Sequence, residues 1–225
     1  MSDPQNLASH LHMPQEPVGA QELAAHLAAR LCHDFLSPAG AIMSGLDLLN
    51  DPSAQDMRED ALGLIATGGQ KLMALLEFDR VAFGASTSAE AFETTKLEQL
   101  ARDVFAHLRP ELDWKVAAPM VPKPCARALL NLAQIGAGAL PTGGVAEITL
   151  AEDGASHLIR VHARGPRARL RSEMVEGLKG LPLGEGLSGY WIQPYYLWAL
   201  ADAAGGDIAF SVGEDEVTIT VRLPA

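Results

Sequence analysis

Cysteine is scarce in this chain of 225 residues. Cys32 and Cys125 are the only two, they form no CxxC pair, and no histidine lies at a spacing that suits zinc. We therefore expect no metal site, and two reduced thiols in the cytoplasm are the simplest interpretation.

Basic residues are also few, because 17 Lys and Arg stand against 28 Asp and Glu and give a formal net charge of −11. Such a chain repels a phosphate backbone, so nucleic acid is a poor candidate partner. The imbalance is uneven: residues 1–88 hold 11 acidic and 4 basic side chains, whereas residues 89–225 hold 17 and 13. This difference indicates two structural units.

The first 18 residues lack the basic start and the apolar stretch of a signal peptide, and we interpret residues 1–18 as a flexible tail. Hydrophobic residues make up 48% and charged residues 20% of the chain, as is ordinary for a globular protein. We therefore expect neither a membrane protein nor a fully disordered chain.

Residues 19–86 have the pattern of a helical hairpin, in which residues 20–50 and 55–83 carry apolar side chains at helical spacing. The turn Asn50-Asp51-Pro52-Ser53 separates the two helices, and Ser53 is the expected N-cap of the second. Helices joined by so short a turn lie antiparallel. Because each covers only half of the other's apolar stripe, we expect the hairpin to dimerise into a four-helix bundle. The stripe residues are Leu23, Leu27, Leu31, Phe35, Ile42, Leu46 and Leu49, then Leu62, Ile65, Leu72, Leu76 and Phe83.

Residues 89–225 have the texture of a mixed α/β unit. Helices are predicted over residues 97–109 and 123–140, and a proline-rich bridge lies between them. Strands are predicted over residues 145–151, 157–163, 207–213 and 216–223, and the last two are expected to form a terminal hairpin.

The stretch RLCHDFLSPAGAI, residues 30–42, carries the candidate chemistry. A histidine nucleophile needs an exposed ring nitrogen, a neutral ring and a neighbour that fixes its tautomer. Asp34 is adjacent to His33 and can hold the near ring nitrogen, and Ser37 lies one turn further along. The alternative is that His33 is an incidental surface residue, which is the commoner case for a lone histidine.

Pro38 removes a backbone donor, and we expect the helix to bend there and to open a docking surface beside His33. Small side chains would let another backbone approach this surface closely. Its predicted residues are Arg30, Leu36, Gly40, Ala41, Met43 and Ser44.

His33-Asp34-Phe35-Leu36-Ser37-Pro38 resembles the H-box of dimeric sensor histidine kinases, usually His-Glu-apolar-basic-Thr/Asn-Pro, which lies in the first helix of such a hairpin. Leu36 stands where a basic residue is usual, and Ser37 where Thr or Asn is usual. Residues 128–144 likewise resemble the nucleotide-binding helix of these kinases and its Gly-Gly turn.

The nucleotide motifs of that family are incomplete here. Asn131 matches the early Asn of the helix, but Ile135 occupies the position of the magnesium-binding Asn, and isoleucine cannot ligate a hard cation. Ala163-Arg164-Gly165-Pro166-Arg167 stands in place of the adenine-reading Asp-x-Gly-x-Gly. Gly184-Glu185-Gly186 is only faintly similar to the phosphate-binding loop, and Ala204 stands where His is usual.

An intact phosphoacceptor box beside a dismantled ATP site resembles the ChpT-type histidine phosphotransferases of alphaproteobacteria. The resemblance implies an α plus α+β fold, in which a long antiparallel helical hairpin dimerises into a four-helix bundle and a kinase-ATPase-like α/β sandwich follows. It also implies a cytoplasmic homodimer that carries phosphate between the receiver domain of a hybrid histidine kinase and the receivers of response regulators in cell-cycle signalling. His33, Asp34 and Ser37 would be catalytic, the receiver would supply magnesium, and no ATP would bind. The alternatives are a divergent ATP-dependent kinase and a non-catalytic module that binds receivers or kinases.

Two further clusters allow more than one interpretation. Five arginines between Arg160 and Arg171, with no acidic residue among them, form either a solvated loop or a grip for an acidic receiver that uses Arg167, Arg169 and Arg171. Residues 190–198 hold five of the twelve aromatic residues. They either plug the vacated nucleotide cleft, form a docking patch, or pack in the core of the last helix.

Overall fold

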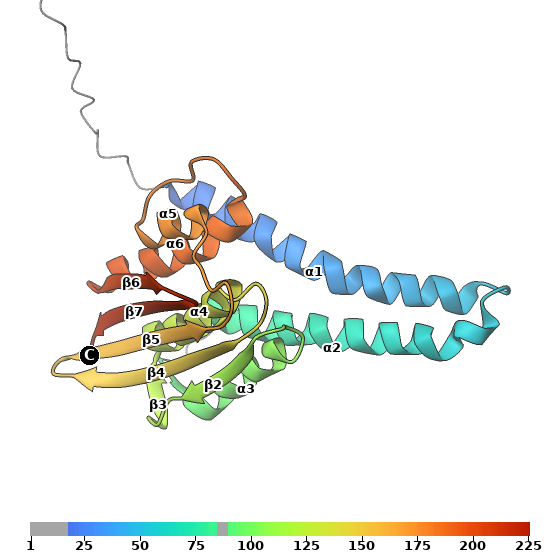
Figure 1. Cartoon of the computed structure of the whole chain (residues 1–225), viewed down its shortest axis with the longest axis horizontal. Coiled ribbons are helices and arrows are strands. Elements are labelled where there is room, and N and C mark those ends of the chain that lie inside the picture. The colour runs from blue at the N-terminus through green and yellow to red at the C-terminus, as the bar shows by residue number, and fades with distance from the viewer. Residues whose placement is uncertain (1–17, 85–89) are drawn as a thin grey trace, which may run out of the picture.

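The computed structural model describes residues 18–84 and 90–225, which form a long helical hairpin attached to an α/β unit (Figure 1). The predicted tail lies outside the described residues except for Val18. Residues 85 and 86, at the end of the predicted hairpin region, and residue 89, at the start of the predicted α/β region, lie outside them too.

Helices α1 (Ala20–Asn50) and α2 (Arg58–Ala82) run antiparallel and form the predicted hairpin, with a short 3₁₀ helix, η1 (Gln55–Met57), before α2. The prediction that Ser53 caps the second helix is wrong. The hydroxyl and the backbone N–H of Ser53 instead donate to Oδ1 of Asp51, at 2.7 and 2.8 Å, and these hydrogen bonds lower the pKa of Asp51. Asp51 therefore shapes the turn.

Two glycines allow the backbones of α1 and α2 to come close together. A Cβ on Gly45 would lie 2.6 Å from the carbonyl oxygen of Ala61, and a Cβ on Gly68 would lie 2.8 Å from the carbonyl oxygen of Pro38. Pro38 is buried within the continuous helix α1 and lies against α2. The two backbones can approach this closely because Gly45 and Gly68 have no side chains.

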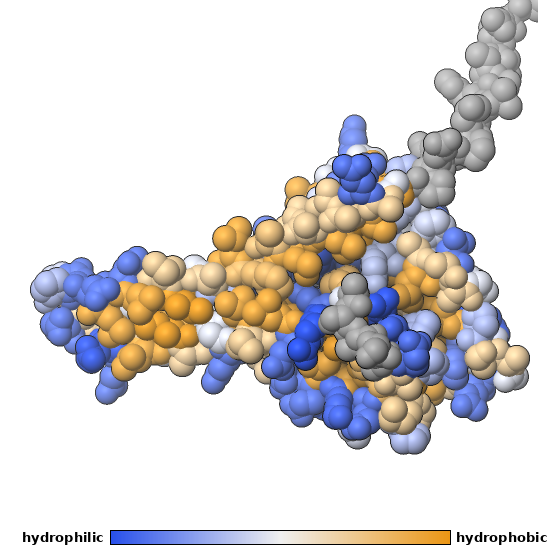
Figure 2. All heavy atoms as spheres, turned by 180° about the vertical axis from the view of Figure 1, so that it is seen from behind, coloured by the Kyte–Doolittle hydropathy of each residue, from blue (hydrophilic) through white to orange (hydrophobic). Residues whose placement is uncertain are grey.

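The apolar stripes of the hairpin are only partly covered. Leu46, Leu62 and Leu76 are 40, 49 and 41% exposed, and Met73 is 54% exposed. Figure 2 shows apolar residues along both helices of the hairpin on the face seen from behind. A large apolar surface therefore remains open on the single chain.

The second unit is built on a five-stranded sheet of order β2-β4-β5-β7-β6. Strand β2 (Glu111–Lys115) pairs with β4 (Val145–Asp153) in parallel, and β4, β5 (Ser156–Arg164), β7 (Glu216–Pro224) and β6 (Asp207–Gly213) pair antiparallel. The four strands predicted from the sequence are confirmed. Strand β2 and the small pair of β1 (Ala91–Glu93) and β3 (Met120–Pro122) were not predicted.

Helices cover one face of this sheet (Figure 1). They are α3 (Thr94–Phe105), α4 (Lys123–Gly138) and α6 (Ser188–Ala203). Helix α5 (Ser172–Leu178), which was not predicted, packs against α6. Helix α4 is buried on nearly all sides because it lies between the sheet and helices α2, α3 and α6. No helix in residues 18–84 and 90–225 is long and apolar enough to span a membrane.

The first half of α1 packs on α6 and joins the two units. Trp191 and Tyr195 are buried there, and they contact Leu23 and Leu27 of α1. The hydroxyl of Tyr195 also accepts a hydrogen bond of 2.8 Å from the backbone N–H of Val18. Trp191 and Tyr195 therefore agree with the interpretation that the aromatic cluster packs in the core.

We predict that Gly68→Ala destabilises the fold by about 1–3 kcal/mol, because the new methyl group would overlap the backbone of α1. Gly63→Ala is the matched control on the same helix. A Cβ there meets nothing within 4 Å, so better helix propensity should stabilise the protein by about 0.5–1 kcal/mol. Urea unfolding followed by circular dichroism measures both, and equal stability of the two variants would contradict the close contact.

Candidate functional site

His33 presents its ring to solvent from the middle of α1, where its side chain is 88% exposed. Its Nδ1 lies 3.2 Å from Oδ1 of Asp34. A carboxylate can only accept a hydrogen bond, so this contact places the proton on Nδ1 and leaves the lone pair on Nε2. The predicted pairing of His33 with Asp34 is therefore present in the structure, and the outer ring nitrogen is available for attack.

Arg30 holds the other oxygen of Asp34. Its Nε lies 3.3 Å from Oδ2 of Asp34, and its terminal nitrogen donates a hydrogen bond of 2.9 Å to the carbonyl oxygen of Gly189 at the start of α6. The side chain of Arg30 is only 15% exposed. Arg30 was predicted to lie on the docking surface, but the structure commits it to contacts within the chain.

The other residues of the predicted docking surface divide by exposure. Gly40 and Ser44 are exposed, as is Ser37, and Leu36 and Met43 are 69 and 57% exposed. Ala41 is half-buried, so it contributes less of this surface than was expected. The outward strip of α1 beside His33 is thus formed mainly by small residues and two large apolar side chains.

A cavity of about 510 Å³ lies beside His33, between α1 and the α/β unit. Arg30, His33 and Asp34 form one wall. The opposite wall comes from α4, α5 and the start of α6. Its lining residues include Gln134, Ile135, Met174, Leu187, Tyr190 and Gln193.

The residues at the positions of nucleotide ligands serve the fold instead. The Asn131 amide is fully buried, donates to the carbonyl oxygens of Ala82 and Arg127, and accepts from Gln193 at 3.2 Å. Ile135 lines the cavity, and Ala163 is buried in β5. Asn131 therefore ties α4 to α2 and to α6, and both of its amide donors are used within the chain.

The Gly184–Leu187 loop donates its backbone hydrogen bonds to two acidic side chains of α5. The N–H of Gly184 lies 3.2 Å from Oε2 of Glu176, and the N–H of Leu187 lies 3.3 Å from Oε1 of Glu173. Backbone N–H groups, first that of Glu173 itself and then that of Leu187, lower the pKa of Glu173. Two carboxylates thus occupy donors of the loop that is faintly similar to a phosphate-binding loop.

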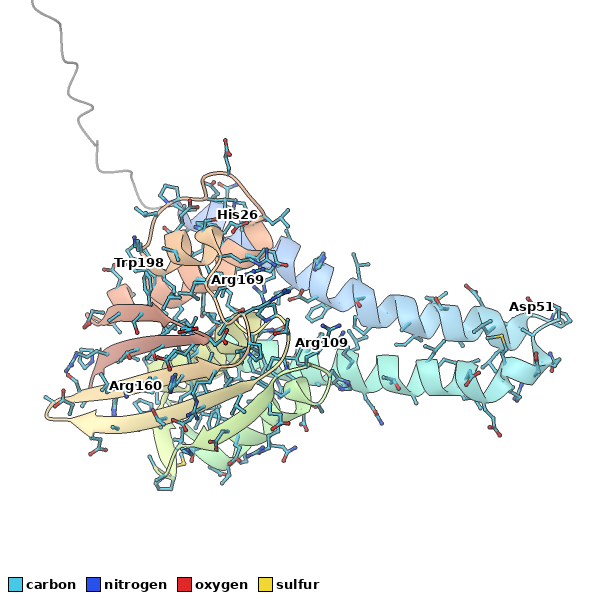
Figure 3. All side chains as sticks on the ribbon, viewed as in Figure 1. His26, Asp51, Arg109, Arg160, Arg169 and Trp198 are labelled. Atoms are coloured by element: carbon cyan, nitrogen blue, oxygen red, sulfur yellow. The ribbon has the colours of Figure 1, made fainter. Side chains whose placement is uncertain are left out.

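The arginines between residues 160 and 171 do not form one patch. Figure 3 shows Arg160 over the sheet and Arg169 near the junction with α1. Arg167, Arg169 and Arg171 are all exposed, and the guanidinium of Arg171 lies 4.3 Å from the ring centre of Tyr190. Since Tyr190 also lines the cavity beside His33, the end of the arginine cluster adjoins the site.

Asp79 of α2 is a titratable neighbour that sequence reasoning missed. It is only 7% exposed, and burial raises its pKa to about 7, while nearby Arg30 lowers the pKa and nearby Asp34 raises it. Its position could not be read from the sequence, because it depends on how α2 lies beside α1. Within the described ranges, no group of three or more His, Cys, Asp or Glu side chains could hold a metal ion.

Comparisons with known proteins agree with this architecture. The family model for the histidine phosphotransferase C-terminal domain matches residues 94–216. The protein phosphotransferase ChpT of Brucella abortus (strain 2308) is 33% identical over 206 residues, which span 91% of this chain and 97% of that protein. A solved structure of a bacterial phosphotransferase is 31% identical, has a TM-score of 0.81, and covers 92% of this chain and 98% of its own.

We predict that Asp79→Asn raises the free energy of unfolding near pH 7.5 by roughly 2–4 kcal/mol. Folding raises the pKa of the Asp79 carboxyl group from 3.8 to about 7, so loss of its proton at higher pH destabilises the folded state. The folded state binds more protons than the unfolded state between these values, so wild-type stability falls across this pH range. The advantage of the variant should therefore shrink toward pH 4.

Denaturant unfolding at several pH values tests this prediction, with Asp202→Asn as an exposed carboxylate control on α6. An advantage of Asp79→Asn that did not change between pH 4 and 7.5 would show that the effect does not come from titration of Asp79.

Proposed function

This chain belongs to the family of ChpT-type histidine phosphotransferases, and from this premise we propose that His33 carries phosphate between receiver domains in a phosphorelay. The donor would be the phosphorylated aspartate of a hybrid histidine kinase, and the acceptor would be the receiver aspartate of a response regulator. The observation that carries the proposal is an exposed His33 whose inner ring nitrogen is held by Asp34.

In the forward step, the lone pair of His33 Nε2 attacks the phosphorus of the receiver's aspartyl phosphate. The N–P bond forms, the P–O bond to the aspartate breaks, and the receiver carboxylate leaves with the electron pair. The phosphorylated ring keeps the proton on Nδ1 and gains positive charge, which the carboxylate of Asp34 offsets at 3.2 Å. Attack by a second receiver's aspartate on the same phosphorus reverses these changes.

Ser37 lies four residues after His33 on the same exposed face of α1, so its hydroxyl can donate to a phosphoryl oxygen. We assign the magnesium that neutralises the phosphoryl oxygens to the receiver. Positioning is then the main task of this chain, since transfer between an acyl phosphate and an imidazole is close to balanced.

We further propose that transfer proceeds without ATP. The side-chain amide of Asn131 forms hydrogen bonds with Ala82, Arg127 and Gln193. Glu173 and Glu176 occupy backbone donors of the Gly184–Leu187 loop, and their negative charges would repel a triphosphate. These contacts support a phosphocarrier over an ATP-dependent kinase.

A receiver would dock on the outward strip of α1, where Leu36, Gly40, Met43 and Ser44 are exposed beside His33. Arg167, Arg169 and Arg171 add positive charge on the α/β side and would steer an acidic receiver surface. We assign a smaller share to Ala41, which is half-buried, and none to Arg30.

We propose that two chains join their hairpins in a four-helix bundle. Leu62, Met73 and Leu76 form an exposed line on α2 whose spacing is typical of paired helices. Leu46 of α1 is also exposed, outside the strip that the receiver would use. A second copy would cover this surface and leave the start of α1 in contact with α6.

Incubation with a phosphorylated receiver domain should label the wild-type protein, and His33→Ala should lose at least about 100-fold of this labelling because no other ring nitrogen replaces Nε2. His107→Ala, at the end of α3, is the matched histidine control and should be labelled like the wild type. The label should be acid-labile and should pass to a second, unphosphorylated receiver.

Equal labelling of His33→Ala would refute the assignment. Labelling from magnesium and ATP alone would favour the divergent kinase, and tight receiver binding with no label at all would favour a non-catalytic module.

For the dimer, we predict a molecular mass of two chains in light scattering, and a shift to one chain for Met73→Glu, since a charge would be buried at the interface. Leu64→Glu is the control, because Leu64 is 40% exposed on another side of α2. A monomeric wild-type protein, or a Met73→Glu variant that remains a dimer, would exclude this interface.

A further inference from the structure

Arg30 connects the phosphoacceptor to a part of the chain that lies far away in sequence. One end of its guanidinium contacts Oδ2 of Asp34, and the other donates to the carbonyl oxygen of Gly189, which is 159 residues away. The side chain is largely withdrawn from water, so both contacts are less screened than on an open surface.

The two oxygens of Asp34 have separate tasks. Oδ1 accepts a hydrogen bond from Nδ1–H of His33, and Oδ2 contacts Arg30. Because one contact fixes the carboxylate on each side, Asp34 cannot rotate away from His33 without losing the contact to Arg30. The series runs from the start of α6 through Arg30 and Asp34 to the reacting ring.

We propose that Arg30 is a positioning residue, which fixes the tautomer and orientation of His33 through Asp34 and takes its own position from the backbone of α6. This inference rests on the proposed transfer through His33. It gives the α/β unit a part in phosphotransfer that does not involve a nucleotide, because the start of α6 sets where Arg30 can lie.

Lysine cannot replace arginine in this arrangement. The planar guanidinium presents donors on two sides, whereas an ammonium group is a single compact charge on a flexible stem. Asp79 is a second acidic side chain near Arg30, and the positive charge of Arg30 lowers the pKa of Asp79. While the buried Asp79 carries its proton, Arg30 has Asp34 as its charged partner.

The test combines Arg30→Gln, Arg30→Lys and Asp34→Asn with the double variant Arg30→Gln/Asp34→Asn. Each single Arg30 variant should slow transfer from a phosphorylated receiver by about 10–100-fold, the usual cost of losing a group that orients a reacting side chain. In the Asp34→Asn background, Arg30→Gln should change the rate less than about 2-fold, since its route to His33 is already gone. Arg58→Gln, an exposed arginine of α2, is the control for a lost positive charge.

Nitrogen NMR of the His33 ring supplies a measurement that needs no phosphate donor. The wild type should hold the proton on Nδ1, and both Arg30 variants should show a mixture of the two neutral tautomers. Arg30→Lys keeps the charge and most of the side-chain length, so it should still fold. An effect of this variant on the tautomer would therefore not come from unfolding.

Fully additive rate losses, or an unchanged Nδ1 tautomer in folded Arg30 variants, would overturn the positioning role. If the wild type fails to accept phosphate while its ring shows the Arg30-dependent tautomer, the proposed function is wrong and the structural link stands. If the wild type transfers phosphate normally and the tautomer of the His33 ring does not change in the Arg30 variants, the proposed function stands and the positioning role of Arg30 is wrong.

Discussion

The packing of α6 against the first half of α1 is the contact on which the rest of this structure depends. Trp191 and Tyr195 fill the space between the helices, and the ring of His26 meets that of Trp191 edge-on at 5.3 Å. This apolar contact brings the start of α6 to Arg30 and so completes the polar series that ends at His33. If α1 and α6 packed loosely, neither the position of Arg30 nor the shape of the cavity would be fixed. Burial of a few aromatic side chains is thus the physical source of the site's geometry.

In the α/β unit, too, polar groups of Asn131 and of the Gly184–Leu187 loop form hydrogen bonds within the chain. A buried amide without partners costs free energy, so the fully buried side chain of Asn131 needs hydrogen bonds within the chain. Gln193 supplies one of them to Asn131, and its amide also lies 2.6 Å from the side-chain oxygen of Gln134. Glu173 and Glu176 do the same for the Gly184–Leu187 loop.

The sequence predicted what depends on near neighbours and missed what depends on assembly. The contact between His33 and Asp34 and the helices of the hairpin follow from local spacing, and both are present. Ser53 does not cap the second helix because the helical turns begin later, after Ala54 and Met57, and Ser53 donates to Asp51 instead. The short strand β2 was missed because its ladder is formed with β4, more than 30 residues later. Arg30 was read as part of a docking surface because nothing local reveals Gly189.

The glycine contacts of the hairpin explain a further limit of hydrophobic patterns. Periodicity identifies which faces are apolar, but it gives no weight to Gly45 and Gly68, where the backbone of one helix lies close to the other helix. Large apolar residues of the same stripe, such as Leu62 and Leu76, remain 49 and 41% exposed. An apolar side chain in a regular stripe therefore need not lie between the two helices that the stripe predicts to pair. On this chain the backbones of α1 and α2 meet at small residues, and large apolar side chains lie on the open face of the hairpin.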